Sequence, residues 1–235
     1  MSFPPLCDFT VNTLNIRGMP IEKLIDGSSF LGTLVFMLEG QDIDDGTAAV
    51  LNAMLVAWVD HGANPPSTAN VRNVASVRGS FAMGAMAALA TFGADHVPIE
   101  ECGKFLREMT IRRHSEHDQY VFVCLHRRVP GFGHPVHTED PRVRPLLKVA
   151  ARHMNTFIHV EALRNAEKCL ARKLNESDSV MPVKPNLAGV TAALWLDLGF
   201  DLDTVGLVPL IGRSVGWAAH YSEQRSLPAF SGSIP

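Results

Sequence analysis

The chain has 235 residues, 46% of them hydrophobic, and a formal net charge of -3 at pH 7. This length and apolar content suffice for one substantial core or two unequal lobes, as in a globular enzyme. The small negative charge, without a concentrated basic stripe, argues against a nucleic-acid-binding protein.

No membrane or secretory signal stands out in the sequence. No apolar run approaches the length that crosses a bilayer, and residues 1–5 lack the basic and apolar segments of a signal peptide. The four cysteines are scattered and form no Cys-x-x-Cys pair, which predicts reduced thiols. We therefore expect a cytoplasmic protein without membrane association.

Apolar residues recur at helical spacing along almost the whole chain. Leu51, Leu55 and Trp58 predict a first long helix that stops at Gly62 and delivers His61 to its C-terminal end. A second helix is predicted from residue 67 through the small residues of positions 84–90, and it ends by presenting His96. These small residues would allow close helix packing in a core or across a dimer.

Later segments continue the helical pattern. Pro98 with two glutamates predicts a further helix start, and residues 112–118 are expected to form a solvated surface. Only residues 120–123 look strand-like, and one strand cannot form a sheet. Further helices are predicted over residues 142–154, 159–174, 186–198 and 203–223, with a polar loop at 175–179. The sequence therefore predicts an all-α fold.

The most informative stretch is residues 129–142, which read Val-Pro-Gly-Phe-Gly-His-Pro-Val-His-Thr-Glu-Asp-Pro-Arg. Its proline and two glycines favour a turn with exposed backbone N–H groups. Such a turn can hold a phosphate or a thioester carbonyl, with His134 beside it as acid, base or hydrogen-bond donor. Asp140 is expected to cap the helix that follows, and Arg142 at the start of that helix can bind a carboxylate.

Four other sequence blocks resemble motifs of a known family and occur in the same order along the chain. Residues 59–68 read Val-Asp-His-Gly-Ala-Asn-Pro-Pro-Ser-Thr, similar to a family pattern Asp-His-x-x-Asn-x-Ser-Thr. Residues 15–30, 93–102 and 215–224 match its first segment, its loop before an acidic helix start and its C-terminal Gly-x-x-Ala-His-x-x-Glu-Gln. Together with residues 129–142, these blocks resemble the citrate synthase superfamily and, within it, the short citryl-CoA lyase type.

The resemblance implies a fold and an assembly. It implies a large helical domain from residues 1–111 and 184–235, a smaller helical domain at residues 112–183, and an active site in the cleft between them. It also implies a homodimer or a higher homo-oligomer.

The resemblance also implies roles for individual residues. His96 would hydrogen-bond the thioester enolate oxygen, and His134 would exchange the proton at the keto or hydroxyl oxygen. The carboxylates of a keto acid would bind His61, Arg142 and Arg213. Coenzyme A would be the cosubstrate, in the form of an acyl-CoA, and would contact the turn formed by Pro130, Gly131, Phe132 and Gly133.

One catalytic position departs from the family. The family carboxylate lies in an Asn-x-Asp segment, and the matching residues 183–190 place Asn186 where the aspartate is expected. An amide cannot take a proton at physiological pH, and loss of a general base costs about two to four decades of rate.

Three explanations for this departure stay open. A nearby carboxylate such as Asp178 serves instead, the reaction needs no acid or base at carbon, or the protein is a binding or regulatory relative without turnover.

Several residues also have ordinary structural interpretations. His61 fits a helix C-cap, His96 beside Asp95 fits a surface pair, and Arg213 fits a structural ion pair. His137 with His134, and His114 with its neighbours, have the spacing of metal pairs but no further ligands, so we expect no metal.

The sequence therefore predicts a carbon-carbon lyase or synthase that acts on a citryl-CoA-like 3-hydroxyacyl thioester. Its products would be a short acyl-CoA and a keto acid. The alternative is a divergent CoA-binding relative, either an acyl-CoA hydrolase or a catalytically weak regulatory protein.

Overall fold

The structure is a computed structural model that describes residues 5–93, 96–125, 129–176 and 183–230. It divides into two compact units, Met1–Asn52 and Ala53–Pro235. This division leaves the smaller domain predicted at residues 112–183 as a prediction. Within the described residues, no helix is both long and apolar enough to cross a membrane.

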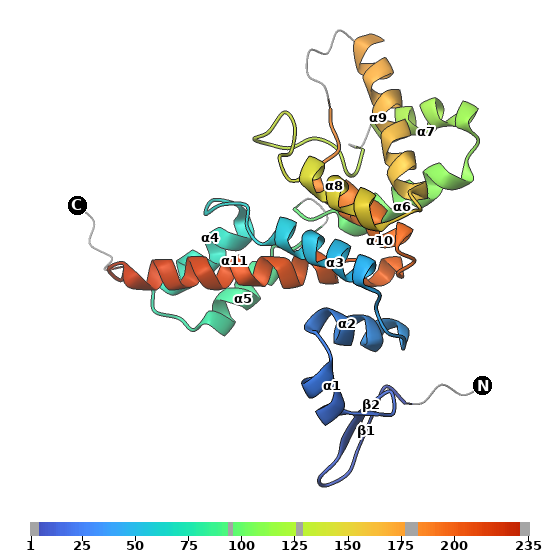
Figure 1. Ribbon diagram of the computed structural model, residues 1–235. Coiled ribbons are helices and arrows are strands. Elements are labelled where there is room, and N and C mark those ends of the chain that lie inside the picture. The colour runs from blue at the N-terminus through green and yellow to red at the C-terminus, as the bar shows by residue number, and fades with distance from the viewer. Residues whose placement is uncertain (1–4, 94–95, 126–128, 177–182, 231–235) are drawn as a thin grey trace. The chain divides into compact units, whose positions relative to one another are not determined.

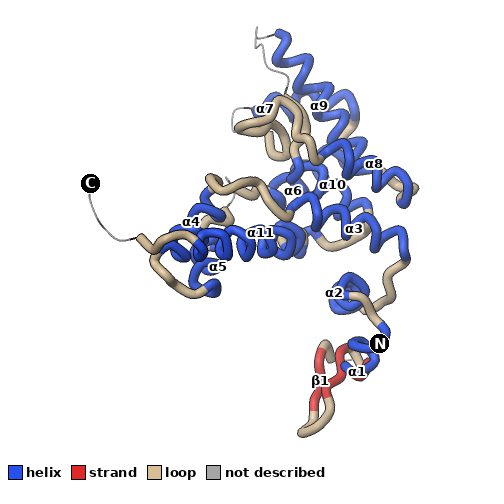
Figure 2. The backbone as a smooth tube through the Cα atoms, turned by 60° about the vertical axis from the view of Figure 1, so that its left-hand side comes forward, coloured by secondary structure: helices blue, strands red, loops and turns tan. Residues whose placement is uncertain are grey.

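The first unit contains a small antiparallel sheet that the sequence did not predict. Its strands are β1 (Cys7–Phe9), β2 (Leu14–Ile16) and β3 (Met19–Pro20), in the order β1-β2-β3. In the described residues the named strands, drawn red in Figure 2, occur in this unit alone. Each strand has at most three residues, so the chain is still mostly helical, as predicted.

Helices α1 (Ile21–Gly27) and α2 (Phe30–Glu39) follow the sheet. The hydroxyl of Ser29 accepts a hydrogen bond from Gly32 N, and Gly40 ends α2 in the left-handed conformation. The Arg17 guanidinium also donates to the carbonyl oxygens of Met37 and Leu38 at this end. Both ends of α2 are therefore capped.

The remaining helices are shown in Figure 1. They are α3 (Asp45–Trp58), α4 (Pro66–Ser76), α5 (Phe81–Leu89), α6 (Ile99–Ile111), α7 (His117–Leu125), α8 (Val143–His153), α9 (Ile158–Glu176), α10 (Leu187–Asp197) and α11 (Leu207–Ser226), with short 3-10 turns at His114–Glu116 and Leu202–Thr204. The helices predicted at residues 142–154, 159–174, 186–198 and 203–223 are confirmed within a few residues at their ends. Of the polar loop predicted at 175–179, residues 175–176 belong instead to the end of α9, and the rest lies outside the described residues.

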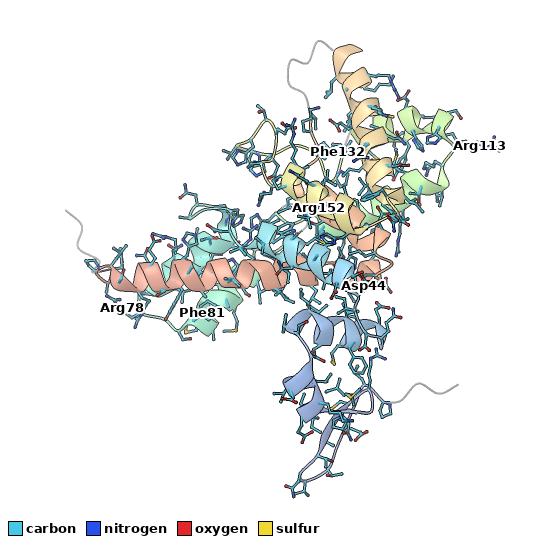
Figure 3. The ribbon with its side chains drawn as sticks, viewed as in Figure 1. Asp44, Arg78, Phe81, Arg113, Phe132 and Arg152 are labelled. Atoms are coloured by element: carbon cyan, nitrogen blue, oxygen red, sulfur yellow. The ribbon has the colours of Figure 1, made fainter. Side chains whose placement is uncertain are left out.

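The single helix predicted from residue 67 to residue 90 is wrong, because α4 and α5 are separate helices. The break contains Arg78 with φ of 65°, and Ser80 then caps α5 by accepting from Met83 N. The Arg78 guanidinium donates to the carbonyls of Arg225 and Leu227 at the end of α11 (Figure 3). The break therefore serves to anchor α11.

The strand-like reading of residues 120–123 is also wrong, because these residues belong to α7. Helix α7 packs against α9, and Val121 is fully buried. The Tyr120 ring stacks on Phe105 with 5.6 Å between centroids. A short apolar run fits a buried helical turn as well as a strand, so its sequence alone does not separate the two.

Helix α10 forms the centre of the second unit. Every residue from Leu187 to Leu196 is buried, and the helix packs against α6, α8 and α9. A helix that is apolar on all sides is expected in such a position. The first turn of α10 also reaches the candidate site, so the core fixes one wall of that site.

Candidate active site

A pocket of about 450 Å³ lies within the second unit. All six residues predicted to bind substrate or to catalyse line it: His61, His96, His134, Arg142, Asn186 and Arg213. They come from positions up to 152 residues apart, counted from residue 61 to residue 213. The elements that hold them therefore decide the geometry of the site.

The end of α3 and helix α11 bring two of these residues together. A Cβ atom added at Gly212 would lie 2.7 Å from Trp58 Cβ and 2.8 Å from Leu55 O, closer than ordinary packing permits. Glycine at this position thus allows α11 to lie directly on the last turn of α3. This contact places Arg213, the next residue, beside the segment that carries His61.

Arg213 is a buried cation without a carboxylate partner in the described part of the chain. Only 2% of the residue is exposed, and its Nε and Nη1 atoms have no hydrogen-bond partner there. Its guanidinium carbon lies 5.4 Å from the centroid of the Trp58 ring, and burial together with Arg142 lowers its pKa to about 10. A buried charge in this state is costly unless a ligand pairs with it.

Trp58 is itself fixed in place. Its Nε1–H donates to the Thr191 hydroxyl on α10 at 2.9 Å. The indole face that Arg213 approaches is therefore held between α3, α10 and α11, and a cation over a tryptophan face is favourable.

His61 has both ring nitrogens buried without a hydrogen-bond partner in the described residues. Burial lowers its pKa to about 3, with further contributions from the positive charges of Arg213 and His96. The imidazole is therefore neutral near pH 7 and offers one donor and one acceptor to a ligand. A helix cap, the ordinary interpretation of this residue, does not account for two unpaired ring nitrogens.

His96 lies next to His61, with 5.5 Å between ring centroids. Its Nε2 atom is 3.2 Å from the buried hydroxyl of Ser67 at the start of α4. Burial, with the charge of Arg213, lowers the pKa of His96. When Ser67 donates this bond, Nδ1 carries the ring hydrogen and can donate to a ligand. Asp95, its suggested surface partner, lies outside the described residues.

His134 has a defined tautomer. Its Nδ1 atom accepts hydrogen bonds from the backbone N–H groups of Val136 at 3.1 Å and His137 at 3.2 Å. Two donors at Nδ1 leave the hydrogen of the neutral ring on Nε2. Burial lowers the pKa of His134, against the raising effect of Asp140. His134 therefore presents an Nε2–H donor.

The glycine turn beside His134 is joined to the segment before α10 (Figure 3 labels Phe132 on this turn). Gly133 N donates to Lys184 O at 2.8 Å, and Asn186 N donates to Gly131 O at 2.9 Å. A Cβ at Gly131 would lie 2.9 Å from the Gly189 Cα atom. These glycines thus permit close backbone packing, and the N–H of Gly133 is used inside the protein. Contact of the turn with CoA stays a prediction.

Both polar atoms of the Asn186 side chain make hydrogen bonds within the protein. Its Oδ1 atom accepts from Gly189 N at 3.1 Å as the cap of α10, and its Nδ2 atom donates to Gly133 O at 2.9 Å. This arrangement favours a positioning role for Asn186. If Asn186 is aligned with the asparagine of the Asn-x-Asp pattern, Ala188 stands at the position of the aspartate. Ala188 also lines the pocket. The sequence analysis missed Ala188, although Asn186, two positions earlier, could have indicated this alignment.

Asp140 and Arg142 form an ion pair in the wall of the pocket. Arg142 donates from Nε at 2.9 Å and from Nη2 at 2.8 Å to the two carboxylate oxygens of Asp140, which is 2% exposed. Asp140 also accepts from the backbone N of Arg142 and of Leu187. Burial acts to raise the pKa of Asp140, but these hydrogen bonds outweigh it and lower that pKa. The prediction that Asp140 caps α8 is wrong, because the N-cap residue of α8 is Arg142 and it has no side-chain cap. The role of Asp140 as the partner of Arg142 was missed.

The two histidine pairs with metal-like spacing do not form larger clusters. His134 and His137 have ring centroids 4.6 Å apart, and His114 and His117 have centroids 4.9 Å apart. Among the described residues, no group of three or more His, Cys, Asp or Glu side chains is placed to hold a metal ion.

Comparison with curated proteins shows that this chain is similar to a family of enzymes. The chain is 21% identical to a 2-methylcitrate synthase of Mycobacterium tuberculosis over 219 residues, covering 91% of this chain and 54% of that protein. It is 27% identical to the citrate synthase of Haloferax volcanii over 220 residues, covering 87% and 53%. The chain thus spans about half the length of the curated relatives it matches.

Solved structures agree with this relationship. The citryl-CoA lyase of Hydrogenobacter thermophilus matches with a TM-score of 0.84 and 26% identity over 97% of this chain and 89% of that chain. An ATP citrate lyase of Methanosaeta concilii in complex with (3S)-citryl-CoA has the same fold, with a TM-score of 0.81, 18% identity and coverage of 97% and 39%. The model of the family "Citrate synthase, C-terminal domain" matches residues 13–229. The chain therefore belongs to the citrate synthase family, with a citryl-CoA lyase-like fold, as its motifs predicted.

Proposed function

We propose that the pocket catalyses retro-Claisen cleavage, or the reverse condensation, of a citryl-CoA-like 3-hydroxyacyl-CoA. The products of cleavage are a short acyl-CoA and a keto acid. The observation that carries this proposal is the convergence of three neutral histidines, one unpaired buried arginine and one paired arginine on a single pocket. CoA, as acyl-CoA, is the cosubstrate, and the turn at residues 130–133 is its proposed contact.

The histidines divide the proton chemistry. His134 presents Nε2–H, so it donates to the keto or alkoxide oxygen in condensation and takes that proton back in cleavage. His96, oriented by Ser67, donates from Nδ1 to the enolate oxygen of the thioester. Neutral rings suit both tasks, because burial disfavours the charged imidazolium.

The arginines hold the acid portion. A ligand carboxylate replaces the missing partner of Arg213, and the unpaired nitrogens of His61 hydrogen-bond to the same ligand. Arg142 directs two of its guanidinium nitrogens to Asp140, so Nη1 remains for a second carboxylate.

A second candidate function follows from the carboxylates of the pocket. In the described lining residues the one carboxylate is Asp140, and its two oxygens already accept four hydrogen bonds. Without a base at carbon, a CoA-binding hydrolase or a catalytically weak regulator is the alternative. Asp178, the other carboxylate considered, lies outside the described residues.

The experiment that tests the proposal follows all CoA species by mass spectrometry. Purified protein is incubated with citryl-CoA, and separately with acetyl-CoA plus oxaloacetate. A lyase releases acetyl-CoA with oxaloacetate, and His134→Ala should lose this activity. The control is His153→Ala, which changes an exposed histidine at the end of α8 and should retain the activity. Release of free CoA alone indicates a hydrolase, and CoA binding without turnover indicates a regulator. Absence of CoA binding at millimolar concentration contradicts all three.

We also propose that the protein is a homodimer through α5. This helix exposes Met83, Met86 and Leu89, with exposed fractions of 53%, 63% and 44%, while Gly84 and Ala88 face the core. Such an apolar face is suited to a second copy of the chain. Light scattering should give a dimer mass for wild type and a monomer mass for Met86→Glu.

A further inference from the structure

Among the described residues, the pocket presents acids and hydrogen-bond donors but no base suited to a carbon-bound proton. Asp140 is 2% exposed, and both of its oxygens are paired with Arg142 and with Leu187 N. A carboxylate in such bonds is a weak base, because each bond stabilises its ionised form. The described lining residues thus contain no carboxylate that is free to deprotonate an acyl-CoA methyl group.

The histidines do not fill this gap. At His134 the basic nitrogen, Nδ1, already accepts two backbone N–H groups, so Nε2–H faces outward as a donor. At His96, donation from Nδ1 to an enolate oxygen uses the nitrogen that is not paired with Ser67. His61 lies in a buried position near Arg213, where a second positive charge is disfavoured.

The first turn of α10 leaves a space where a base would otherwise stand. Ala188, in this first turn, lines the pocket with a methyl group. Thr191 lies three residues further along the same helix face and holds Trp58, which in turn packs on Arg213. Leu187, Trp58 and the unpaired guanidinium of Arg213 line the same pocket as Ala188.

We propose that the acyl substrate of this pocket is a 2-carboxyacyl thioester of the malonyl type, whose own carboxylate occupies the space beside Ala188. This inference rests on the proposed function of the site and names its substrate class. Loss of carbon dioxide then creates the enolate, so no base at carbon is required. The carboxylate leaves from the carbon position at which a base would otherwise remove a proton.

The electrons and atoms of the step balance. The bond between C2 and the carboxyl carbon breaks, carbon dioxide leaves, and the electron pair forms the thioester enolate, whose oxygen accepts a hydrogen bond from His96. C2 then bonds to the keto carbon of the acid partner. The keto oxygen takes a proton from Nε2 of His134, and His134 regains a proton from water. The product is a 3-hydroxyacyl-CoA, and no oxidant or reductant is needed.

The surroundings suit this step. Leu187, Ala188 and Trp58 form an apolar border on the carboxylate, and an apolar border disfavours a carboxylate more than neutral carbon dioxide. The guanidinium of Arg213 remains available for the keto acid, as the proposed function requires. Release of carbon dioxide also drives the condensation forward.

The test compares two acyl donors in one assay. Wild-type protein is incubated with oxaloacetate and either malonyl-CoA, labelled with ¹³C at its free carboxylate, or acetyl-CoA. Labelled carbon dioxide and the 3-hydroxyacyl-CoA product are both quantified by mass spectrometry. We expect malonyl-CoA to react at least about 100-fold faster than acetyl-CoA, since this is the lower range of the rate that a missing general base costs.

Two variants at one position sharpen the test. Ala188→Asp supplies a base and repels the substrate carboxylate, so the ratio of malonyl-CoA to acetyl-CoA turnover should fall by about 100-fold or more. Ala188→Asn has nearly the same size without the charge, and it should keep the preference for malonyl-CoA even where both rates fall. Circular dichroism and CoA titration check that the variants fold and bind.

The outcomes separate this inference from the proposed function. Cleavage of citryl-CoA without a preference for malonyl-CoA overturns the inference and leaves the proposed function standing. Release of labelled carbon dioxide or free CoA without a new carbon-carbon bond also overturns it. Absence of both CoA binding and turnover contradicts both proposals. An unchanged preference in Ala188→Asp shows that the space beside Ala188 does not hold the substrate carboxylate.

Discussion

Two walls of the same pocket differ in whether their polar groups are hydrogen-bonded within the protein. In the paired wall, formed by Asp140, Arg142, Asn186 and Gly133, the carboxylate, the amide and the turn are joined by hydrogen bonds within the protein. In the unpaired wall, formed by His61 and Arg213, both imidazole nitrogens and two guanidinium nitrogens are buried without partners among the described residues. The paired wall therefore supports the shape of the pocket, and the unpaired wall is where a ligand gains most from binding.

The largest effect is expected from breaking the paired wall at Asp140. Asp140→Ala leaves the Arg142 guanidinium, whose side chain is 24% exposed, without its buried partner. Removing one member of a buried pair costs about 3–5 kcal/mol of unfolding free energy. Urea unfolding measures this loss. Glu139→Gln breaks the exposed pair with Arg144 nearby and should cost less than about 1 kcal/mol. Equal losses in the two variants would contradict the distinction.

The next effect separates binding from stability at Arg213. Arg213→Met removes a buried charge that has no partner in the free protein, so the unfolding free energy should stay the same or rise by about 1 kcal/mol. Oxaloacetate binding, measured by calorimetry, should weaken by about 2–5 kcal/mol because the ligand carboxylate loses its partner. A stability loss as large as that of Asp140→Ala would mean that Arg213 belongs with the paired groups.

A smaller effect is expected where the glycine turn contacts α10. In Gly189→Ala the added Cβ would lie 2.6 Å from Gly131 O, which forces the turn away from the helix. Overpacking of this kind costs about 1–3 kcal/mol. The thermal unfolding temperature and the turnover that depends on His134 should both fall in this variant. Gly206→Ala is the matched control, because its nearest neighbour would be Glu100 Oε1 at 4.0 Å.

The smallest effect concerns the pH dependence of the unpaired wall. The pKa of His61 is about 3 in the folded state against 6.5 when unperturbed. Between these values the unfolded state binds the extra proton, so His61 lowers stability as the pH falls from about 6.5. His61→Gln should therefore lose less thermal stability than wild type between pH 7 and pH 4.5. The exposed His114→Gln should follow wild type, and a steeper loss in His61→Gln would contradict this account.

Sequence patterns predicted the helices that have strong apolar periodicity or defined caps, such as α6, α8 and α10. They failed where tertiary packing chose between local options. Residues 120–123 are helical because α7 packs against α9, and the break between α4 and α5 depends on Arg78 reaching the end of α11. Neither contact can be predicted from the local sequence, because each involves residues far away along the chain.

The members of the site were predicted from ordered motifs, and the structure brings all six to one pocket. The sequence could not show which of them are paired. Asp140 and Arg142 are two residues apart and fit a helix start equally well without an ion pair. Whether Arg213 has a partner depends on residues more than 100 positions away, such as Trp58. The use of the Asn186 amide likewise depends on Gly133, which is 53 positions away.

The contact between Gly131 and Gly189 has a consequence for folding. Backbone atoms from the two glycines touch without any side chain between them, and hydrogen bonds from Gly133 and Asn186 lie on either side. The turn that carries His134 cannot reach its final conformation until the first turn of α10 exists. Site assembly and core formation are then one cooperative event, so a locally opened turn and a frayed α10 should be the same partially unfolded state.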